Sequence, residues 1–316
     1  MELNNPNKAY LSIIRLKTNN YDFWQVFVVV LTGDFIKMPY VFGTKIKKDA
    51  AAYFDKNADR YNSYYVDQNE YVKWTRHVTI SNLVQKYITN KAEAIVDIGC
   101  GPGYLAFDLA ERGFYGIGMD ISPNMLKICR SKIGSVKNGK LWTFEEGDSE
   151  KMRFKDGSFS CAIASGVLEY MPSDEGMFKE VSRVLKPKGF FICSVSNLFG
   201  YTTCLNPIID KVKSLPGVLS IASIIRKSVT KSSYGATSLG FNPRKHFLPT
   251  FKKRLRKHGF SVVEDFYLHF TLFPAPLSTM FERVTGYLDK KLDILDKTPL
   301  RHLGACYIAI AQKESK

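Results

Sequence analysis

The chain has 316 residues, of which 45% are hydrophobic and 24% are charged, and its net charge is +15 at pH 7. This length suits one large domain with additions, and the sequence contains no internal repeat and no low-complexity tract. Every apolar run is shorter than the roughly twenty residues of a membrane-spanning helix, or is broken by Pro, Gly or charge, so we expect no such helix.

The first residues lack the charged-then-apolar pattern of a secretory signal peptide. We expect residues 1–80 to form an N-terminal helical segment over the substrate side, and residues 81–316 to form the main domain with insertions at about 198–245 and 271–301. The six cysteines fall mostly on predicted helices and strands, which favours reduced thiols over disulfides. A cytoplasmic protein is therefore expected.

A helix is expected at Ser81–Ile88, and the most informative stretch of the chain follows it, from Ala94 to Met125. Residues 94–98 are short, apolar and β-branched, as in a buried parallel strand, and a glycine-rich loop follows them. A helix then begins at Tyr104, and a second strand ends in Asp120. Glycines let the backbone approach a ligand closely, and the carboxylate can accept hydrogen bonds from ribose hydroxyls. This pattern predicts a nucleotide-type site.

The spacing of the glycines bears on which nucleotide binds. A dinucleotide site uses G-x-G-x-x-G, whereas here Gly99, Gly101 and Gly103 run G-x-G-x-G and the bulky Tyr104 follows. Asp97 next to this loop would repel a pyrophosphate but would suit a cationic amino group. The loop therefore favours a ligand with an amino-acid part.

Further elements follow in chain order, including a helix that ends in a Lys-Pro-Lys-Gly turn at residues 186–189 and a strand at 190–195. A basic helix is expected at Pro249–His258, and two closing strands at Phe260–Tyr267 and Cys306–Ala311. Strands that alternate with helices predict one doubly wound α/β sheet.

The motif VDIGCGPG and four later segments in the same order resemble the class I S-adenosylmethionine-dependent methyltransferases, and in particular their small-molecule, quinone and glycan branch. The resemblance implies a Rossmann-like, mostly parallel seven-stranded sheet with an antiparallel edge pair, and S-adenosyl-L-methionine as cofactor. It also implies that Asp120 holds the ribose and Asp148 contacts the adenine. The full set of implied cofactor residues is Asp97, Gly99, Cys100, Gly101, Gly103, Asp120, Ile121, Met125, Gly147, Asp148, Ser149 and Ser165.

The resemblance is imperfect at two positions. Ser160 stands where the family often has an aspartate, and Tyr170 replaces a frequent histidine. Candidates for a general base are therefore His246, Tyr170 and Glu169. An activated sulfonium methyl group needs no metal, and no His, Asp or Glu cluster in the sequence has ligand spacing, so no metal site is expected.

The positive charge is uneven along the chain. The net charge is +4 in residues 1–90, zero in 91–197 and +11 in 198–316, so the excess bears on partners rather than on the cofactor core. Apolar stretches beside cations at 23–31, 215–225 and 266–277 suit either an anionic membrane surface or packing within the protein. The first alternative would place the protein at the inner face of the membrane.

We therefore expect methyl transfer to a small or amphiphilic, lipid-like acceptor, at oxygen, on a molecule such as a quinone precursor or a lipid-linked sugar. A nucleic-acid acceptor is disfavoured because Ser165-Gly166-Val167-Leu168 replaces the Asn/Asp-Pro-Pro-aromatic motif of base-amine methyltransferases. RNA methylation stays as an alternative supported by charge alone. A protein that binds the cofactor without transferring its methyl group is the other alternative, and the sequence does not indicate an oligomeric state.

Overall fold

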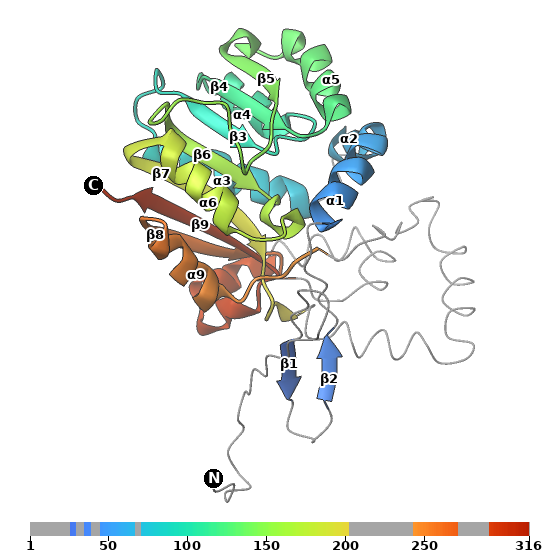
Figure 1. Ribbon diagram of the computed structural model, residues 1–316, viewed down its shortest axis with the longest axis vertical. Helices are drawn as coiled ribbons and strands as arrows, with labels where there is room; N and C mark the ends of the chain where they lie inside the picture. The colour runs from blue at the N-terminus through green and yellow to red at the C-terminus, as the bar shows by residue number, and fades with distance from the viewer. Residues whose placement is uncertain are drawn as a thin grey trace, which may run out of the picture.

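The computed structural model describes residues 26–29, 35–38, 45–66, 71–201, 243–270 and 291–315. Within them a seven-stranded sheet has the order β5-β4-β3-β6-β7-β9-β8 (Figure 1). Its strands are β3 (Ile95–Ile98), β4 (Gly116–Asp120), β5 (Trp142–Glu146), β6 (Phe159–Ser165), β7 (Leu185–Ser196), β8 (Phe260–Leu268) and β9 (Cys306–Lys313).

Helices cover both faces of this sheet. One face carries α3 (Tyr71–Tyr87), α4 (Tyr104–Glu111) and α5 (Pro123–Lys132), and the other carries α6 (Glu175–Val184) and α9 (Leu248–Lys257). Two further helices, α1 (Lys45–Lys56) and α2 (Ala58–Val66), lie beside α5 (Figure 1). Single-turn helices are η1 (Ile133–Ser135), η2 (Gly139–Leu141), η3 (Leu168–Tyr170), η4 (Asp293–Lys297) and η5 (Pro299–Leu303).

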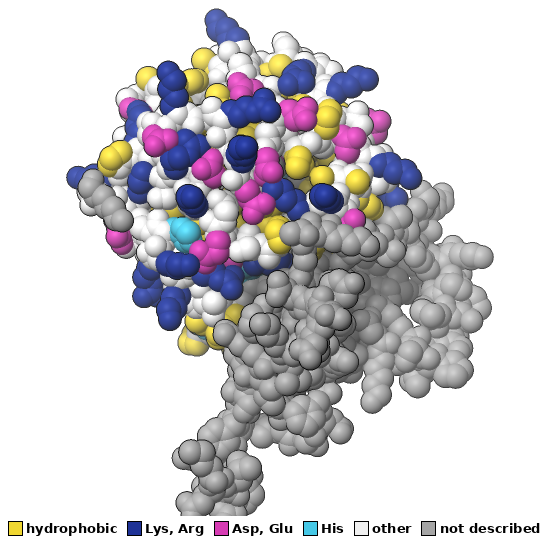
Figure 2. Space-filling view, viewed as in Figure 1, with side chains coloured by type: hydrophobic (Ala, Val, Ile, Leu, Met, Phe, Trp, Pro, Cys, Tyr) yellow, Lys and Arg dark blue, Asp and Glu magenta, His cyan; other side chains and the backbone are white. Residues whose placement is uncertain are grey.

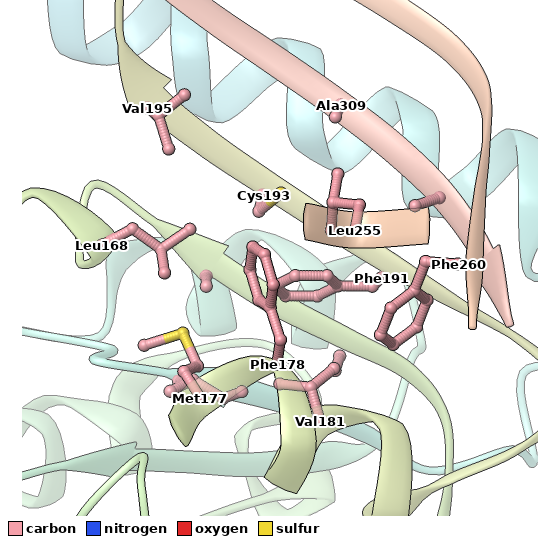
Figure 3. Close-up of a cluster of buried hydrophobic side chains, with 14 of the residues drawn as sticks. Leu168, Met177, Phe178, Val181, Phe191, Cys193, Val195, Leu255, Phe260 and Ala309 are labelled. Atoms are coloured by element: carbon pink, nitrogen blue, oxygen red, sulfur yellow. The ribbon is translucent and has the colours of Figure 1, made fainter. Parts of the chain in front are cut away.

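Each face of the sheet has its own hydrophobic core. Figure 3 shows the core under α6 and α9, where the rings of Phe178 and Phe191 have centroids 5.9 Å apart and those of Phe191 and Phe260 lie 5.6 Å apart. Leu255 of α9 packs into the same cluster and is fully buried. Burial of each such side chain contributes about 1.5–3 kcal/mol to the folding free energy. The two cores fix the sheet as a rigid platform for the loops at its edge.

The sheet confirms the predicted fold class. Strands β3 to β7 pair in parallel, while β9 runs antiparallel to both β7 and β8. The two closing strands are therefore an antiparallel pair at one edge, as the resemblance implied.

Three details differ from the expectations. Helix α3 begins at Tyr71, ten residues before the expected start at Ser81, so the expected domain boundary falls inside a helix. The expected Lys-Pro-Lys-Gly turn lies within the bounds of β7. This strand pairs with β6 both before and after an irregularity, and Lys188 in the irregular part has a φ of 63°. The N-terminal segment is not wholly helical, since β1 (Val26–Val29) and β2 (Phe35–Met38) form an antiparallel pair.

Much of the predicted insertions lies outside the described residues, including the apolar stretch 215–225 and residues 271–277. The described part of the third apolar stretch is packed into the protein, since Tyr267, Leu268 and Phe270 are buried. In the part of the chain that the structure describes, no helix has the length and apolar character to cross a bilayer.

Candidate cofactor and active site

The loop between β3 and α4 is shaped by left-handed backbone that L-residues with a Cβ rarely adopt. Gly99 has a φ of 68° and Gly101 a φ of 54°. A Cβ on Gly99 would lie 2.4 Å from a methyl group of Val167, so glycine is also required there for space. By contrast, a Cβ on Gly101 would meet only the ring of Tyr61 at 3.9 Å. Gly101 thus exposes its backbone to an open cavity.

This cavity lies at the carboxyl ends of β3, β4, β5 and β6. Its empty volume is about 1000 Å³, counted out to its open side. It is lined by every predicted cofactor residue except Gly103, namely by Asp97, Gly99, Cys100, Gly101, Asp120, Ile121, Met125, Gly147, Asp148, Ser149 and Ser165. The sheet order thereby brings together residues that are spread over about seventy positions of the chain.

Gly103 has another function. It precedes α4 as its N-cap residue with a φ of 85°, and a Cβ there would lie 2.9 Å from both Cys129 Sγ and the Phe107 ring. Gly103 therefore faces the core rather than the cavity, and the structure assigns it a role in packing the loop.

Asp97 is the most unusual group in the cavity. Its side chain is 2% exposed, and its Oδ2 atom has no hydrogen-bond partner among the described residues. Burial, with a smaller contribution from the charge of Asp120, raises the pKa of Asp97 to about 7. A buried acceptor without a partner is costly unless a ligand satisfies it. A ligand with a protonated amino group would supply the positive charge and the N–H donors that this position lacks.

Asp120, at the end of β4, is hydrogen-bonded to the glycine loop. Its Oδ2 accepts a hydrogen bond from the Gly101 amide at 2.8 Å, and its Oδ1 accepts one from the Ser122 amide at 2.9 Å. Burial raises the pKa of Asp120, although these backbone N–H groups oppose the shift. A carboxylate offers about four lone-pair positions, so two remain for a ribose diol.

Asp148 lies at the end of the cavity beside β5. Its Oδ1 accepts hydrogen bonds from Lys47 Nζ at 2.5 Å and from the Glu150 amide at 2.9 Å. Burial alone would raise the pKa of Asp148, but the hydrogen bond and charge of Lys47 and the Glu150 amide together hold the pKa below its usual range. Lys47 comes from α1 and was not predicted from the sequence, where nothing distinguishes it from the neighbouring Lys45 and Lys48.

Helices α1 and α2 form a lid segment, defined here as residues 45–66, along one wall of the cavity. Asp55 accepts hydrogen bonds from Ser122 Oγ at 2.7 Å and from the Asn124 amide at 3.0 Å. The Phe54 ring contacts the Tyr170 ring with centroids 5.0 Å apart. The lid segment is thereby attached to the cofactor loop and to the loop after β6.

The three predicted general-base candidates do not all lie at the cavity. Tyr170 lines the cavity, but burial raises the pKa of its phenol well above the usual range, so the hydroxyl stays protonated. Glu169 and His246 do not line the cavity. Glu169 is buried and accepts a hydrogen bond from Ser196 Oγ at 3.2 Å.

His246 belongs to a buried ion cluster around Asp174. Its Nε2 lies 3.1 Å from Asp174 Oδ1, and that carboxylate also accepts bonds from Arg244 at 2.8 Å and Arg254 at 2.7 Å. Arg244 additionally donates to the carbonyl of Met171 at 2.9 Å. This cluster therefore attaches the chain that follows the first insertion to the cavity's loop, and the structure corrects the placement of His246 from the reacting centre to this support.

His77 of α3 lines the cavity and was missed in the sequence. The expected helix began only at Ser81, which left His77 outside any element. The signal that could have found it is its spacing, because His77 lies three and seven residues before the buried Ile80 and Val84 on one helical face.

The basic helix α9 uses much of its charge within the protein. Lys252 pairs with Asp265 at 2.5 Å, Arg254 with Asp174 at 2.7 Å and Lys257 with Glu175 at 2.9 Å. Basic and acidic side chains alternate over the face shown in Figure 2 rather than forming a basic stripe. Among the described residues no group of three or more His, Cys, Asp or Glu side chains is arranged to hold a metal ion.

Comparisons with known proteins identify the family of the chain. Residues 96–193 match the family model of the methyltransferase domain. The chain is 32% identical over 199 residues to a demethylmenaquinone methyltransferase of Chlorobaculum parvum, covering 61% of this chain and 76% of that protein. It is 37% identical over 97 residues to a sterol 4-C-methyltransferase of Caenorhabditis elegans, covering 31% of this chain but only 29% of that longer protein.

A solved complex of the Haloferax volcanii Trm112 methyltransferase activator with a methyltransferase contains a chain of the same fold. Its TM-score is 0.56 at 16% identity, and the match covers 84% of this chain and 98% of that chain. The fold and the cavity define an S-adenosylmethionine-binding α/β protein. The chain belongs to the class I S-adenosylmethionine-dependent methyltransferases, and S-adenosyl-L-methionine is its cofactor.

Proposed function

We propose that this protein transfers the methyl group of S-adenosylmethionine to a hydroxyl oxygen of a small or amphiphilic acceptor. The observation that carries the proposal is the two-part character of the cavity. Its polar part contains the unpartnered Asp97 carboxylate beside the glycine loop. The remaining wall is apolar and aromatic and includes Phe54, Tyr61, Tyr170 and Met171. Such a wall suits a hydrophobic acceptor better than a polar or highly charged one.

The residues of the chain would divide the task between binding and orientation. The cofactor supplies an activated methyl group, and displacement requires an acceptor atom in line with the methyl–sulfur bond. Asp97, Asp120 and Asp148 would hold the amino group, ribose and adenine, respectively. The lid segment would then exclude water from the apolar part, which strengthens the electrostatic interactions inside.

The named relatives support an acceptor of this chemical class. One relative is named for a sterol and another for demethylmenaquinone, and both are hydrophobic ring molecules. We extend the proposal to presentation of the acceptor at an anionic membrane surface. The net charge of +11 in residues 198–316 supports this extension, as do the exposed side chains of Ile294, Leu300 and Leu303 on η4 and η5.

Methyl-labelled S-adenosylmethionine, incubated with the protein and separate host extracts of lipid, polar metabolite and RNA, tests the proposal. Label in the lipid or metabolite extract is the expected result. Label in RNA alone would replace the proposed acceptor, and cofactor binding without any transfer would indicate a binding protein. Gly101→Val serves as the control that lacks a cofactor site. For the membrane extension, flotation with vesicles containing anionic lipid should retain the protein at low salt, and failure to float would remove that part.

A further inference from the structure

Helix α3 runs in the opposite direction to the strand that follows it. It ends at Tyr87, and the chain then enters β3 at Ile95, so the first half of α3 lies at the carboxyl edge of the sheet. The other end is attached to β8, because Lys86 and Tyr87 each bond Glu264 at 2.7 Å. The direction of α3 and its position along the sheet are therefore fixed.

His77 lies on the same face of α3 as the buried residues, nearer the N-terminus of the helix, and extends past the edge of the sheet. Ile80, Val84 and Ile88 follow on this face toward the C-terminal end and are buried under α4 and the sheet. His77 is partly exposed and lines the cavity. All five histidines lie in the described part of the chain, and His77 is the only one of them that lines this cavity.

His77 lines the cavity together with Ser165 at the end of β6 and with Gly166 and Val167 after it. Asp148, Asp120 and Asp97 follow β5, β4 and β3 across the sheet, and the next strand, β6, ends at Ser165. A cofactor held by the three carboxylates would direct its reactive end toward β6. The guanidinium of the adjacent Arg76 reaches this end, since its Nη1 lies 3.1 Å from the position of a Cβ on Gly166, and Val167 and Tyr170 beyond Gly166 line the same cavity as His77.

Other groups near this position are less suited to take up a proton. The Tyr170 phenol stays protonated because burial raises its pKa. The Asp97 carboxylate faces the glycine loop, where the cofactor's amino group would pair with it. An imidazole titrates close to neutral pH without any special environment, which suits a general base.

We propose that His77 is the catalytic base, taking the proton of the acceptor hydroxyl during methyl transfer; this inference rests on the proposed function. An oxygen lone pair of the acceptor forms the new O–CH₃ bond, and the electrons of the breaking S–CH₃ bond return to sulfur, which becomes a neutral thioether. The hydroxyl proton passes to the imidazole nitrogen. The resulting imidazolium later releases this proton to water, which restores the neutral base.

The placement of His77 can be tested without knowing the acceptor. In protein with ¹³C-labelled histidine, NMR titrations are compared for the S-adenosylmethionine and S-adenosylhomocysteine complexes, and the His77 signal is assigned by its loss in His77→Gln. The two ligands differ in the positive charge on sulfur. The His77 pKa should be lower by about half a unit or more in the S-adenosylmethionine complex, with the other four histidines unaffected. Identical His77 titration in both complexes would overturn the placement.

The catalytic role is tested with labelled S-adenosylmethionine and the lipid extract as acceptor. His77→Gln should lower kcat about 100-fold or more, keep the cofactor Kd within about threefold, and lose the acid limb of the pH–kcat profile. The matched control is His302→Gln at an exposed position, which should behave as the wild type. A variant with the wild-type kcat and pH profile would overturn the role of His77. Absence of transfer by the wild-type protein would instead overturn the proposed function, and the NMR comparison would still decide the placement.

Discussion

Lys47 Nζ lies 2.5 Å from Asp148 Oδ1 and 2.6 Å from Glu150 Oε2, so a single ammonium group joins the lid segment to the end of the cavity beside β5. Together with the bonds of Asp55 to Ser122 and Asn124, it attaches α1 at two points, one after β5 and one at the start of α5. We expect these contacts to rearrange when the cofactor enters or leaves.

Replacing Lys47 with Met should loosen the lid segment without disturbing the core. The pairs are partly exposed, with Lys47 at 18% and Asp148 at 42% side-chain exposure, so each contributes no more than about 1 kcal/mol. We expect the dissociation rate of S-adenosylmethionine to rise about two- to tenfold in a stopped-flow measurement. Lys48→Met, at the next and exposed position, is the control. Equal dissociation rates for both variants would remove Lys47 from the release step.

Asp120→Ala should weaken binding of S-adenosylmethionine by about 1–3 kcal/mol, because charged hydrogen bonds to the ribose are lost. Calorimetric titration measures the effect, and thermal unfolding separates it from loosening of the Gly101 loop that Asp120 also bonds. Asp108→Ala on the outer face of α4 should bind normally, since Asp108 does not line the cavity. An unchanged affinity of the Asp120 variant would refute its ribose role.

Gly101→Val should abolish cofactor binding while leaving the protein folded, since the added side chain would project into the open cavity rather than the core. Its control is Gly157→Val, because Gly157 has a similar φ of 61° but no atom within 4 Å of the added Cβ. Both variants carry the same kind of backbone strain. If they lose affinity equally, strain rather than occupation of the cavity is responsible.

The Asp174 cluster should dominate the stability of the later part of the chain. Asp174→Ala removes the buried carboxylate that pairs with Arg244 and Arg254, which costs about 3–5 kcal/mol of unfolding free energy at pH 7. Urea unfolding measures this loss. Glu175→Ala next to it should cost less than about 1 kcal/mol, because the Glu175 side chain is 41% exposed and its ion pairs are screened by solvent.

The same cluster has a defined pH dependence. Burial alone would raise the pKa of Asp174, but its bonds with His246, Arg244 and Arg254 hold it well below the usual range. A depressed carboxyl pKa stabilises the folded state above the unfolded pKa of about 3.9 and loses that contribution as the pH falls below it. Wild-type stability should therefore fall below pH 4 more steeply than that of Asp174→Ala. Parallel curves would contradict the assignment.

The sequence predicted the sheet, and a set of residues that line one cavity at its edge, because both depend on local patterns. β-Branched runs and glycine loops determine where parallel strands end, and the ends of neighbouring parallel strands meet at one edge. Asp97, Asp120 and Asp148 could therefore be placed together from motif order alone. Gly103 was predicted to contact the cofactor but faces the core. A glycine with a positive φ can be required for close packing in the core as well as for close approach of a ligand.

The other groups at the site depend on tertiary contacts that no local pattern encodes. Lys47 reaches Asp148 across 101 positions, and His246 joins Asp174 across 72. His77 was missed because α3 begins ten residues before the expected start, so the sequence prediction left His77 outside any helix. The loop that holds His246 also follows a long insertion, whose length alone gave no indication of where the chain returns.

The most direct test of the cofactor site is the pH dependence of S-adenosylmethionine binding, followed by calorimetry between pH 6 and 7.5 for the wild type and Asp97→Asn. Because Asp97 has a pKa of about 7 without ligand and must be ionised to pair with an ammonium group, wild-type affinity should be about tenfold weaker at pH 6 than at pH 7.5. The Asn variant should bind about 10- to 150-fold more weakly at pH 7.5 and show little dependence on pH. Equal affinities for the two proteins, or a wild-type affinity that is constant over this range, would contradict the assignment of Asp97 to the cofactor.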